Sequence, residues 1–291
     1  MAQITTIAVL GAGTMGRGIA HVSALAGFET RLYDTDGAAL GKAEASIHRN
    51  LAKGVELAKV DAEAAARARG LLHLHASLPA AVTGAGLVIE AVPEDVALKI
   101  ETFRAVALHA PQEAIFASNT SALSITEMAA ASGRPARFAG MHFFNPVHLM
   151  KLIELVRGLE TSQETLEVLT RVGERMGKEV VRVNEAPGFV TSRINALIGN
   201  EAFRMLQEGV ASAEDIDKAL KLGLNHPMGP FEMADLVGLD VRLSILEFLH
   251  RTLGEAYRPN QILVQHVHAG RLGRKAGRGV YTYDEQGKRL P

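Results

Sequence analysis

The chain has 291 residues, of which 47% are hydrophobic and 22% are charged, with a formal net charge of −1 and no cysteine. This length and hydrophobic content suffice for two domains with their own cores and exclude a disordered or fibrous chain. The nearly neutral charge excludes a general attraction to nucleic acid or to an anionic membrane, and the lack of cysteine excludes disulfides and thiolate catalysis.

A glycine-rich segment near the N-terminus predicts a dinucleotide-binding unit. An apolar run over residues 7–10 predicts a buried strand, and the spacing G-x-G-x-x-G follows it. Glycines at this spacing allow a tight turn, close approach of the backbone to a pyrophosphate, and close packing of helix on strand. Apolar residues then recur at helical spacing, so a helix N-terminus would face the bound anion. The residues that we expect at the cofactor here are Gly11, Gly13, Thr14, Met15 and Gly16.

The next predicted strand, over residues 28–34, ends at an acidic residue. Asp34 follows Gly16 at nearly the distance, about 20 residues, at which such units place an acid that binds the adenosine ribose hydroxyls and repels a 2′-phosphate. Strand, loop, helix, strand and acid together predict NAD as the cofactor. Arg31 and Arg17 keep NADP as an alternative, because an arginine near the ribose tolerates the 2′-phosphate.

The remaining part of the first half alternates between strand and helix patterns. Helical stretches lie between several of the predicted strands, as over residues 161–177, and residues 37–70 predict an inserted helix pair. This alternation is typical of a Rossmann-type, doubly wound, mostly parallel sheet covered on both faces. Besides the first two, the predicted strands are 71–77, 87–92, 114–118, 137–144, 151–158 and 178–183.

The sequence changes character near residue 184, where Pro187 and Gly188 open a long helical pattern that continues in further helices to about residue 254. We therefore predict an NAD-binding domain over residues 1–183 and an all-α substrate and dimerisation domain over residues 184–291. A domain without a sheet leaves apolar helix faces to cover, and we expect a homodimer through it. The apolar positions that suggest such a face are Leu243, Leu246 and Leu249.

Three short stretches concentrate polar residues that could carry chemistry: SNTSAL at 118–123, GMHFFNPVHLMKLIEL at 140–155 and APGFVTSR at 186–193. With the glycine loop, they resemble the L-3-hydroxyacyl-CoA dehydrogenases, and within these the short-chain 3-hydroxybutyryl-CoA dehydrogenases. The resemblance covers nearly the whole chain. HFFNP with Glu154 twelve positions after its histidine is more specific than the glycine fingerprint.

This resemblance implies reversible, NAD-dependent oxidation of a short-chain (S)-3-hydroxyacyl-CoA to the 3-ketoacyl-CoA, in fatty acid or butanoate metabolism. A neutral imidazole is suited near pH 7 to take the hydroxyl proton as hydride leaves, and a carboxylate on its second nitrogen orients it. The family places these roles at His142 and Glu154. It places polar groups around the substrate oxygens at Ser121 and Asn145.

Further site residues follow from the same resemblance. Glu94 and Lys99 would approach the nicotinamide half of the cofactor, while Ser46 and Lys53 on the inserted helix pair would meet the CoA moiety. Lys53 offers a cation to CoA phosphates, with a solvated helix lysine as the equal alternative. Ser192 stands where most members carry Asn. Serine is shorter and has one donor instead of two. Either a water fills the gap, or the acyl chain-length preference and the rate of this enzyme differ from those of other members.

Two other functions stay open on the sequence. A related two-domain 3-hydroxyacid dehydrogenase would act on free acids through a catalytic lysine, but the HFFNP histidine and its glutamate favour the first interpretation. A non-enzymatic NAD-binding structural protein is the second alternative, since a fold does not dictate function.

We expect no metal site in this chain. His73 and His75 would share one face of a strand, as would His266 and His268 if that stretch is extended, but neither pair has an obvious third ligand. Neither a basic leader with a cleavable apolar segment nor an apolar stretch of membrane-spanning length occurs in the sequence, so we expect a cytoplasmic protein without membrane contact.

Overall fold

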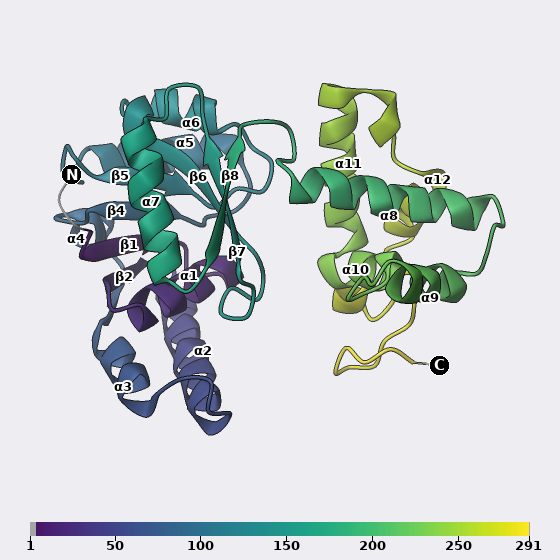
Figure 1. Ribbon diagram of the computed structural model, residues 1–291, viewed down its shortest axis with the longest axis horizontal. Coiled ribbons are helices and arrows are strands. Elements are labelled where there is room, and N and C mark those ends of the chain that lie inside the picture. The colour runs from purple at the N-terminus through teal and green to yellow at the C-terminus, as the bar shows by residue number, and fades with distance from the viewer. Residues whose placement is uncertain (1–3, 291) are drawn as a thin grey trace. The chain divides into compact units, whose positions relative to one another are not determined.

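The computed structural model describes residues 4–290 (Figure 1). The chain divides into two compact units, one that ends at Ala186 and one that begins at Pro187. This division falls three residues beyond the domain boundary expected from the sequence. Among the described residues, no helix combines the length and the apolar character that crossing a bilayer requires.

Over the described residues, the first unit is built on an eight-stranded sheet in the order β3-β2-β1-β4-β5-β6-β7-β8. Neighbouring strands are parallel except for the antiparallel pair β6–β7. The predicted Rossmann-type, mostly parallel sheet is therefore confirmed. Strand order reverses between β1 and β4, and ligands of such sheets bind beyond the carboxyl ends of the strands at this point. The strands are β1 Thr6–Leu10, β2 Glu29–Tyr33, β3 Leu72–His75, β4 Leu87–Glu90, β5 Ile115–Ser118, β6 Phe138–Phe143, β7 Leu152–Arg157 and β8 Glu179–Asn184.

Helices cover the sheet because its central strands are buried on both faces. Every residue of β1, β4 and β5 is buried, as expected of near-continuous apolar runs in a parallel sheet. Helix α7 lies across one face (Figure 1) and buries the apolar residues Leu166, Leu169 and Val172. The helices around the sheet are α1 Thr14–Leu25, α4 Leu78–Val82, α5 Val96–Ala107, α6 Ile125–Ala131, η1 Pro135–Arg137 and α7 Gln163–Arg175.

The inserted helix pair is also confirmed. Helices α2 (Gly37–Glu56) and α3 (Ala62–Gly70) stand between β2 and β3 and extend away from the sheet (Figure 1). Each begins at an aspartate that accepts a backbone hydrogen bond in its first turn: Asp36 from Ala38 N at 2.8 Å, and Asp61 from Ala64 N at 2.9 Å. Such caps satisfy amide groups that the helix leaves free.

The second unit is helical, as predicted, and has its own core. Ser212 caps α9, with Asp215 N donating to its hydroxyl at 3.1 Å. Beyond α12, the described chain forms isolated β-bridges, such as that between Tyr283 and Arg289. The helices are α8 Thr191–Gln207, α9 Ala213–Gly223, α10 Pro230–Val237, α11 Leu239–Leu253, η2 Glu255–Tyr257, α12 Gln261–His268 and η3 Arg274–Ala276.

One sequence expectation for this unit is wrong. The leucines taken as a partner-facing stripe, Leu243, Leu246 and Leu249, are buried in the core of the unit itself. A periodic apolar stripe identifies the face that must be covered, but it does not tell which element covers it. His266 and His268 lie in α12 and not in an extended segment, so they do not share the face of a strand.

Candidate active site

The glycine loop joins β1 to α1, and two of its glycines are required sterically. A Cβ on Gly16 would lie 1.7 Å from Gly11 O, and a Cβ on Gly11, whose φ is +98°, would lie 2.7 Å from Ala91 O. Around Gly13 there is nothing within 4 Å of such a Cβ, so that position is open to a ligand. Thr14 begins α1 directly after Gly13, and the first amides of the helix are thus presented to an anion.

Asp34 lies directly after β2 and against this loop. Its Oδ2 accepts a hydrogen bond from Ala12 N at 2.7 Å, and its Oδ1 accepts one from Asp36 N at 2.9 Å. The carboxylate is therefore fixed beside the turn where a dinucleotide's ribose would bind. A negative charge in this place favours a ribose diol over a 2′-phosphate.

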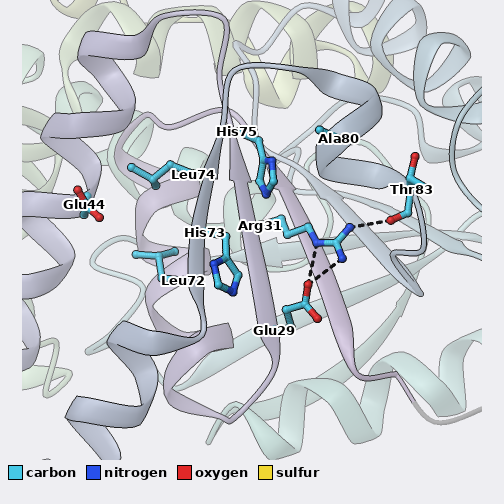
Figure 2. Close-up of a pocket in the computed structure, with 9 residues that line it drawn as sticks. All are labelled: Glu29, Arg31, Glu44, Leu72, His73, Leu74, His75, Ala80 and Thr83. Atoms are coloured by element: carbon cyan, nitrogen blue, oxygen red, sulfur yellow. Dashed lines mark hydrogen bonds and ion pairs between the residues drawn. The ribbon is translucent and has the colours of Figure 1, made fainter.

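Arg31 does not provide the basic neighbour that NADP would need. Figure 2 shows its guanidinium turned toward Glu29 and the backbone of Thr83. Nε donates to Glu29 Oε1 at 2.9 Å and Nη1 to Thr83 O at 2.6 Å. These groups line an open surface pocket with His73 and His75 (Figure 2). In the described part of the chain, no group of three or more His, Asp or Glu side chains is arranged to hold a metal ion.

His142 and Glu154 meet across the one antiparallel pair of strands. They are directly opposite each other in the register of β6 and β7, where side chains of the same face lie close together. His142 Nδ1 is 2.8 Å from Glu154 Oε2, and both residues are buried. The twelve-residue spacing seen in the sequence is thus the length of a hairpin that returns a carboxylate to the histidine.

Two neighbours fix the end of β6 around His142. The ring of Phe144 lies with its centroid 4.4 Å from that of His142. Phe143 N donates to the side-chain Oδ1 of Asn119 at 2.9 Å, so an amide side chain extends the ladder beyond the last backbone pair of β5 and β6. Asn145 follows in the exposed part of the loop.

Ser121, Glu94 and Lys99, all expected from the sequence, are brought together at the carboxyl ends of β4 and β5. Glu94 Oε1 accepts a hydrogen bond from Ser121 N at 2.9 Å, and Glu94 Oε2 is 3.3 Å from Lys99 Nζ. Lys99 is also 2.6 Å from Glu90, and both members of that ion pair are buried. Burial raises the pKa of Glu90, and the positive charge of Lys99 acts in the opposite direction, to lower it.

Sequence reasoning missed Glu90 and Thr120. Glu90 accepts hydrogen bonds from Ser118 Oγ at 2.6 Å and from Val92 N at 2.7 Å. Thr120 Oγ1 donates to Glu94 Oε1 at 2.6 Å. An acid inside the predicted buried strand 87–92 was a usable signal, because a buried carboxylate requires a partner.

Lys53 lies at a second feature of the first unit, a basic pocket of about 490 Å³ between α1, α2, the loop after β6 and the end of α7. Its positively charged lining residues are Lys53, Lys59, Lys151, Arg175 and Lys178. Lys53 is exposed and 2.8 Å from Glu56 Oε1. Ser46 is on the same helix, α2, but is not among the lining residues.

The same pocket contains two stacked histidines. The rings of His21 and His148 lie 5.4 Å apart and nearly parallel. Burial, followed by the nearby His148 and Lys178, lowers the pKa of His21 to about 4. Lys178 Nζ donates to Met150 O at 2.7 Å, and burial lowers its pKa.

Ser192, expected at the substrate, lies in the second unit, in the first turn of α8. It is partly buried. Its neighbour Arg193 donates through Nε to the Tyr257 hydroxyl at 3.1 Å, a contact within that unit.

Family models assign both units. Residues 6–186 match the NAD-binding domain of 3-hydroxyacyl-CoA dehydrogenase, and residues 188–283 match the C-terminal domain of the same enzyme. The chain belongs to the 3-hydroxyacyl-CoA dehydrogenase family. This confirms the predicted family, and with it the NAD cofactor and the enzyme class, an NAD-dependent oxidoreductase.

Individual relatives agree with this assignment over nearly the full length. The 3-hydroxybutyryl-CoA dehydrogenase of Bradyrhizobium diazoefficiens is 44% identical, over 97% of this chain and 96% of its own. The crystal structure of (S)-3-hydroxybutyryl-CoA dehydrogenase from Ralstonia eutropha superposes with a TM-score of 0.94 at 40% identity, covering 97% of this chain and 100% of that one. The 3-hydroxyadipyl-CoA dehydrogenase of Escherichia coli is 40% identical, over 97% of this chain and 60% of its own.

Proposed function

We propose that this 3-hydroxyacyl-CoA dehydrogenase oxidises short-chain (S)-3-hydroxyacyl-CoA, such as 3-hydroxybutyryl-CoA, reversibly to the 3-ketoacyl-CoA. The observation that carries the proposal is the buried His142–Glu154 pair, on β6 and β7 of the unit that also holds the dinucleotide fingerprint. The names of the two 3-hydroxybutyryl-CoA dehydrogenases above support the short acyl group.

His142 acts as the general base in this proposal. With Nδ1 hydrogen-bonded to Glu154, Nε2 takes the proton of the substrate's 3-hydroxyl as that carbon becomes a carbonyl carbon. Glu154 holds one tautomer of the ring and stabilises the imidazolium that forms. Bound NAD supplies the acceptor for the hydride that leaves the same carbon. In the reverse direction, the imidazolium returns its proton to the oxygen.

The other groups of the chain bind and orient the cofactor and the substrate in this proposal. Gly11, Gly13, Gly16 and the first turn of α1 hold the pyrophosphate, and Asp34 holds the adenosine ribose. Ser121 and Asn145 surround the substrate oxygens. We keep Ser192 as a substrate-binding residue, whose single hydroxyl offers one donor to the acyl-CoA.

The basic pocket supports a CoA ester over a free acid. Lysine and arginine side chains bind phosphate through charge-assisted hydrogen bonds, and Lys53, which lines this pocket, is the residue that we assign to CoA. Ser46 lies about two turns before Lys53 on α2, outside the lining of the pocket, and we assign it a smaller part. A 3-hydroxyacid dehydrogenase has no need of such a cation-lined pocket, which makes it the weaker candidate.

The experiment that tests the proposal is a substrate ladder. NADH formation is followed with 3-hydroxyacyl-CoA esters of increasing chain length, with 3-hydroxyadipyl-CoA, and with free 3-hydroxybutyrate. We expect the highest kcat/KM with 3-hydroxybutyryl-CoA. Equal rates with the free acid would contradict the CoA assignment, and a preference for long or dicarboxylic acyl groups would contradict the short-chain assignment.

We infer a homodimer through residues 184–291, a place in the cytoplasm, and a part in fatty acid or butanoate metabolism. The dimer has structural support of its own, because the second unit carries exposed leucines and an apolar groove between α8 and α9. We propose the domain limits 1–183 and 184–291 as functional limits, since both catalytic partners His142 and Glu154 precede residue 184.

A further inference from the structure

Thr120 is fully buried in the turn that follows β5 and carries no role in the function described so far. Its Oγ1 donates to Glu94 Oε1 at 2.6 Å and accepts from Ala122 N at 3.2 Å and Leu123 N at 2.9 Å. A hydroxyl has one donor and two acceptor positions, so these contacts use all three. Thr120 therefore closes the turn that contains Ser121 and links it to Glu94.

Glu94 is the second residue, after Thr120, that holds this turn in place. The same Oε1 accepts from Ser121 N at 2.9 Å and from Ser121 Oγ at 3.3 Å. One carboxylate oxygen thus holds the backbone and the side chain of Ser121 together with the hydroxyl of Thr120. Hydrogen bonds to a charged acceptor are roughly twice as strong as neutral ones, so this oxygen defines where Ser121 lies.

The second carboxylate oxygen of Glu94 contacts a buried cation, the ammonium of Lys99. The side chain of Glu94 is 42% exposed, whereas that of Lys99 is 1% exposed. Three oxygens surround Lys99 Nζ: Glu90 Oε1 at 2.6 Å, Val92 O at 3.2 Å and Glu94 Oε2 at 3.3 Å. An ammonium has three donors, so its position is set by β4 and the segment that follows it. The carboxylate of Glu94 is consequently anchored to the sheet.

We propose that Thr120 and Glu94 are positioning residues that set the place of the Ser121 hydroxyl in the substrate site. This inference rests on the proposed function, in which Ser121 contacts the substrate oxygens. Thr120 is buried and acts only through Glu94 and the turn. The role is additional to any contact that Glu94 makes with the cofactor.

A displaced Ser121 lowers the rate of the chemical step more than it weakens binding. Misplacement of a reacting or orienting group by about 1 Å can cost ~100-fold in rate. Loss of one of the hydrogen bonds to Glu94 leaves Ser121 N–H in place, so the expected shift is smaller. We expect about a 10-fold fall in kcat, with the Kd for NADH unchanged.

The test compares Thr120→Val, which keeps the shape and removes the hydroxyl, with Thr120→Ser, which keeps the hydroxyl. Steady-state kinetics with 3-hydroxybutyryl-CoA at saturating NAD, NADH binding by fluorescence and thermal unfolding are measured for both. We expect the valine variant to lose about 10-fold in kcat and the serine variant to stay within about 2-fold of wild type. A valine variant with wild-type kcat, whatever its Tm, would overturn the proposal.

A double-mutant cycle separates positioning of Ser121 from a general structural effect. In the Ser121→Ala background, Thr120→Val is expected to lower kcat by less than about 2-fold, because the group that it positions is already gone. Additive losses would overturn the proposal. If the valine variant does not fold, Thr120→Ala, which also removes the hydroxyl, enters the same cycle with the same expectation. Wild-type enzyme without turnover of any 3-hydroxyacyl-CoA would instead refute the proposed function, and this inference with it.

Discussion

Among single residues, the proposed chemistry depends most on the burial of the His142–Glu154 pair. Glu154 is 1% exposed, and its Oε2 is 2.8 Å from Nδ1 of the ring. A carboxylate in such a place is stable only with a partner, and in the proposed mechanism it orients the ring of His142. The pair therefore assists the step in which the ring gains a proton.

The first prediction concerns the histidine. His142→Gln should lower kcat by about 10²-fold to 10⁴-fold, because general base catalysis typically contributes that much. The Kd for NADH should stay close to that of wild type, since we assign binding of the cofactor to the glycine loop and Asp34. Stopped-flow or steady-state NADH formation measures kcat, and fluorescence titration measures the Kd. A variant with nearly normal kcat would show that a group other than His142 accepts the substrate's proton.

The second prediction concerns the coupling of the pair. Glu154→Gln keeps the shape of the side chain and removes the charge that stabilises the imidazolium, so kcat should fall as well. In the double variant with His142→Gln, the losses should not add, because Glu154 acts only through the ring. Additive losses in kcat would show that Glu154 has a separate role.

The third prediction concerns cofactor choice at Asp34. Arg31 is engaged by Glu29 and Thr83, and the carboxylate of Asp34, held by Ala12 N, is the charge that we expect beside the ribose. Wild-type enzyme should therefore have a much higher kcat/KM with NAD than with NADP. Asp34→Ala should narrow that ratio by removing the repulsion of the 2′-phosphate. Equal use of both cofactors by the wild type would contradict the assignment.

Among whole elements, the contact of α1 with the loop after β6 makes stability depend on pH. His21 on α1 is buried against His148, and within the described residues its Nδ1 has no hydrogen-bond partner. Its pKa of about 4 lies below 6.5, the ordinary pKa of a histidine side chain. Below pH 6.5 the unfolded chain takes up a proton that the folded chain does not, so stability falls as the pH is lowered from 6.5 to 4.

The fourth prediction follows from this difference. Wild-type protein should lose about 2 kcal/mol of unfolding free energy between neutral pH and about pH 5 through this residue. His21→Gln has no such titration, so its loss over the same interval should be smaller by about that amount. Urea unfolding at the two pH values measures both. Identical pH dependence of the two proteins would contradict a buried, neutral His21.

Elements of this fold can be predicted from the sequence where one local pattern decides them. The buried run of β1 and the glycine spacing after it allow one conformation, because Gly11 and Gly16 have no room for a Cβ. Contacts between distant elements are different. The acid Glu90 inside a predicted buried strand signals that it has a partner, but the assembled sheet is needed to identify Lys99 and Ser118 as those partners. The hydroxyl of Thr120 belongs to no periodic pattern, and its partner Glu94 comes from another turn.

The family resemblance predicted one contact between distant elements, whereas the apolar spacing of a helix did not predict its partner. HFFNP and Glu154 suggested a histidine–carboxylate pair, and the antiparallel register of β6 and β7 brings the two side chains together. The apolar spacing of α11 was equally clear, yet Leu246 is buried within its own unit. Spacing shows that a face is apolar, and the surrounding elements decide what covers it.

For the molecule as a whole, the question is what covers the apolar surface of the second unit. The leucines of α11 are used internally, but others on the last turn of α9 and just after it are exposed: Leu222 by 77% and Leu224 by 67%. Leu224 also lines an apolar groove with Leu197, Met205 and Leu220. Monomeric proteins rarely leave such surface uncovered, and in the homodimer that we propose a second copy would cover it symmetrically.

The fifth prediction is that the protein is a dimer held through this surface. Light scattering at micromolar concentration should give twice the chain mass of 31.1 kDa. Leu224→Asp places a charge in the groove and should shift the mass toward the monomer, because an unpaired charge in an interface is costly. Leu159→Asp, at a leucine of the first unit that is 81% exposed, is the matched control and should leave the dimer intact. A wild-type mass of one chain would refute the dimer, and a dimer that survives Leu224→Asp would place its interface on another part of the surface.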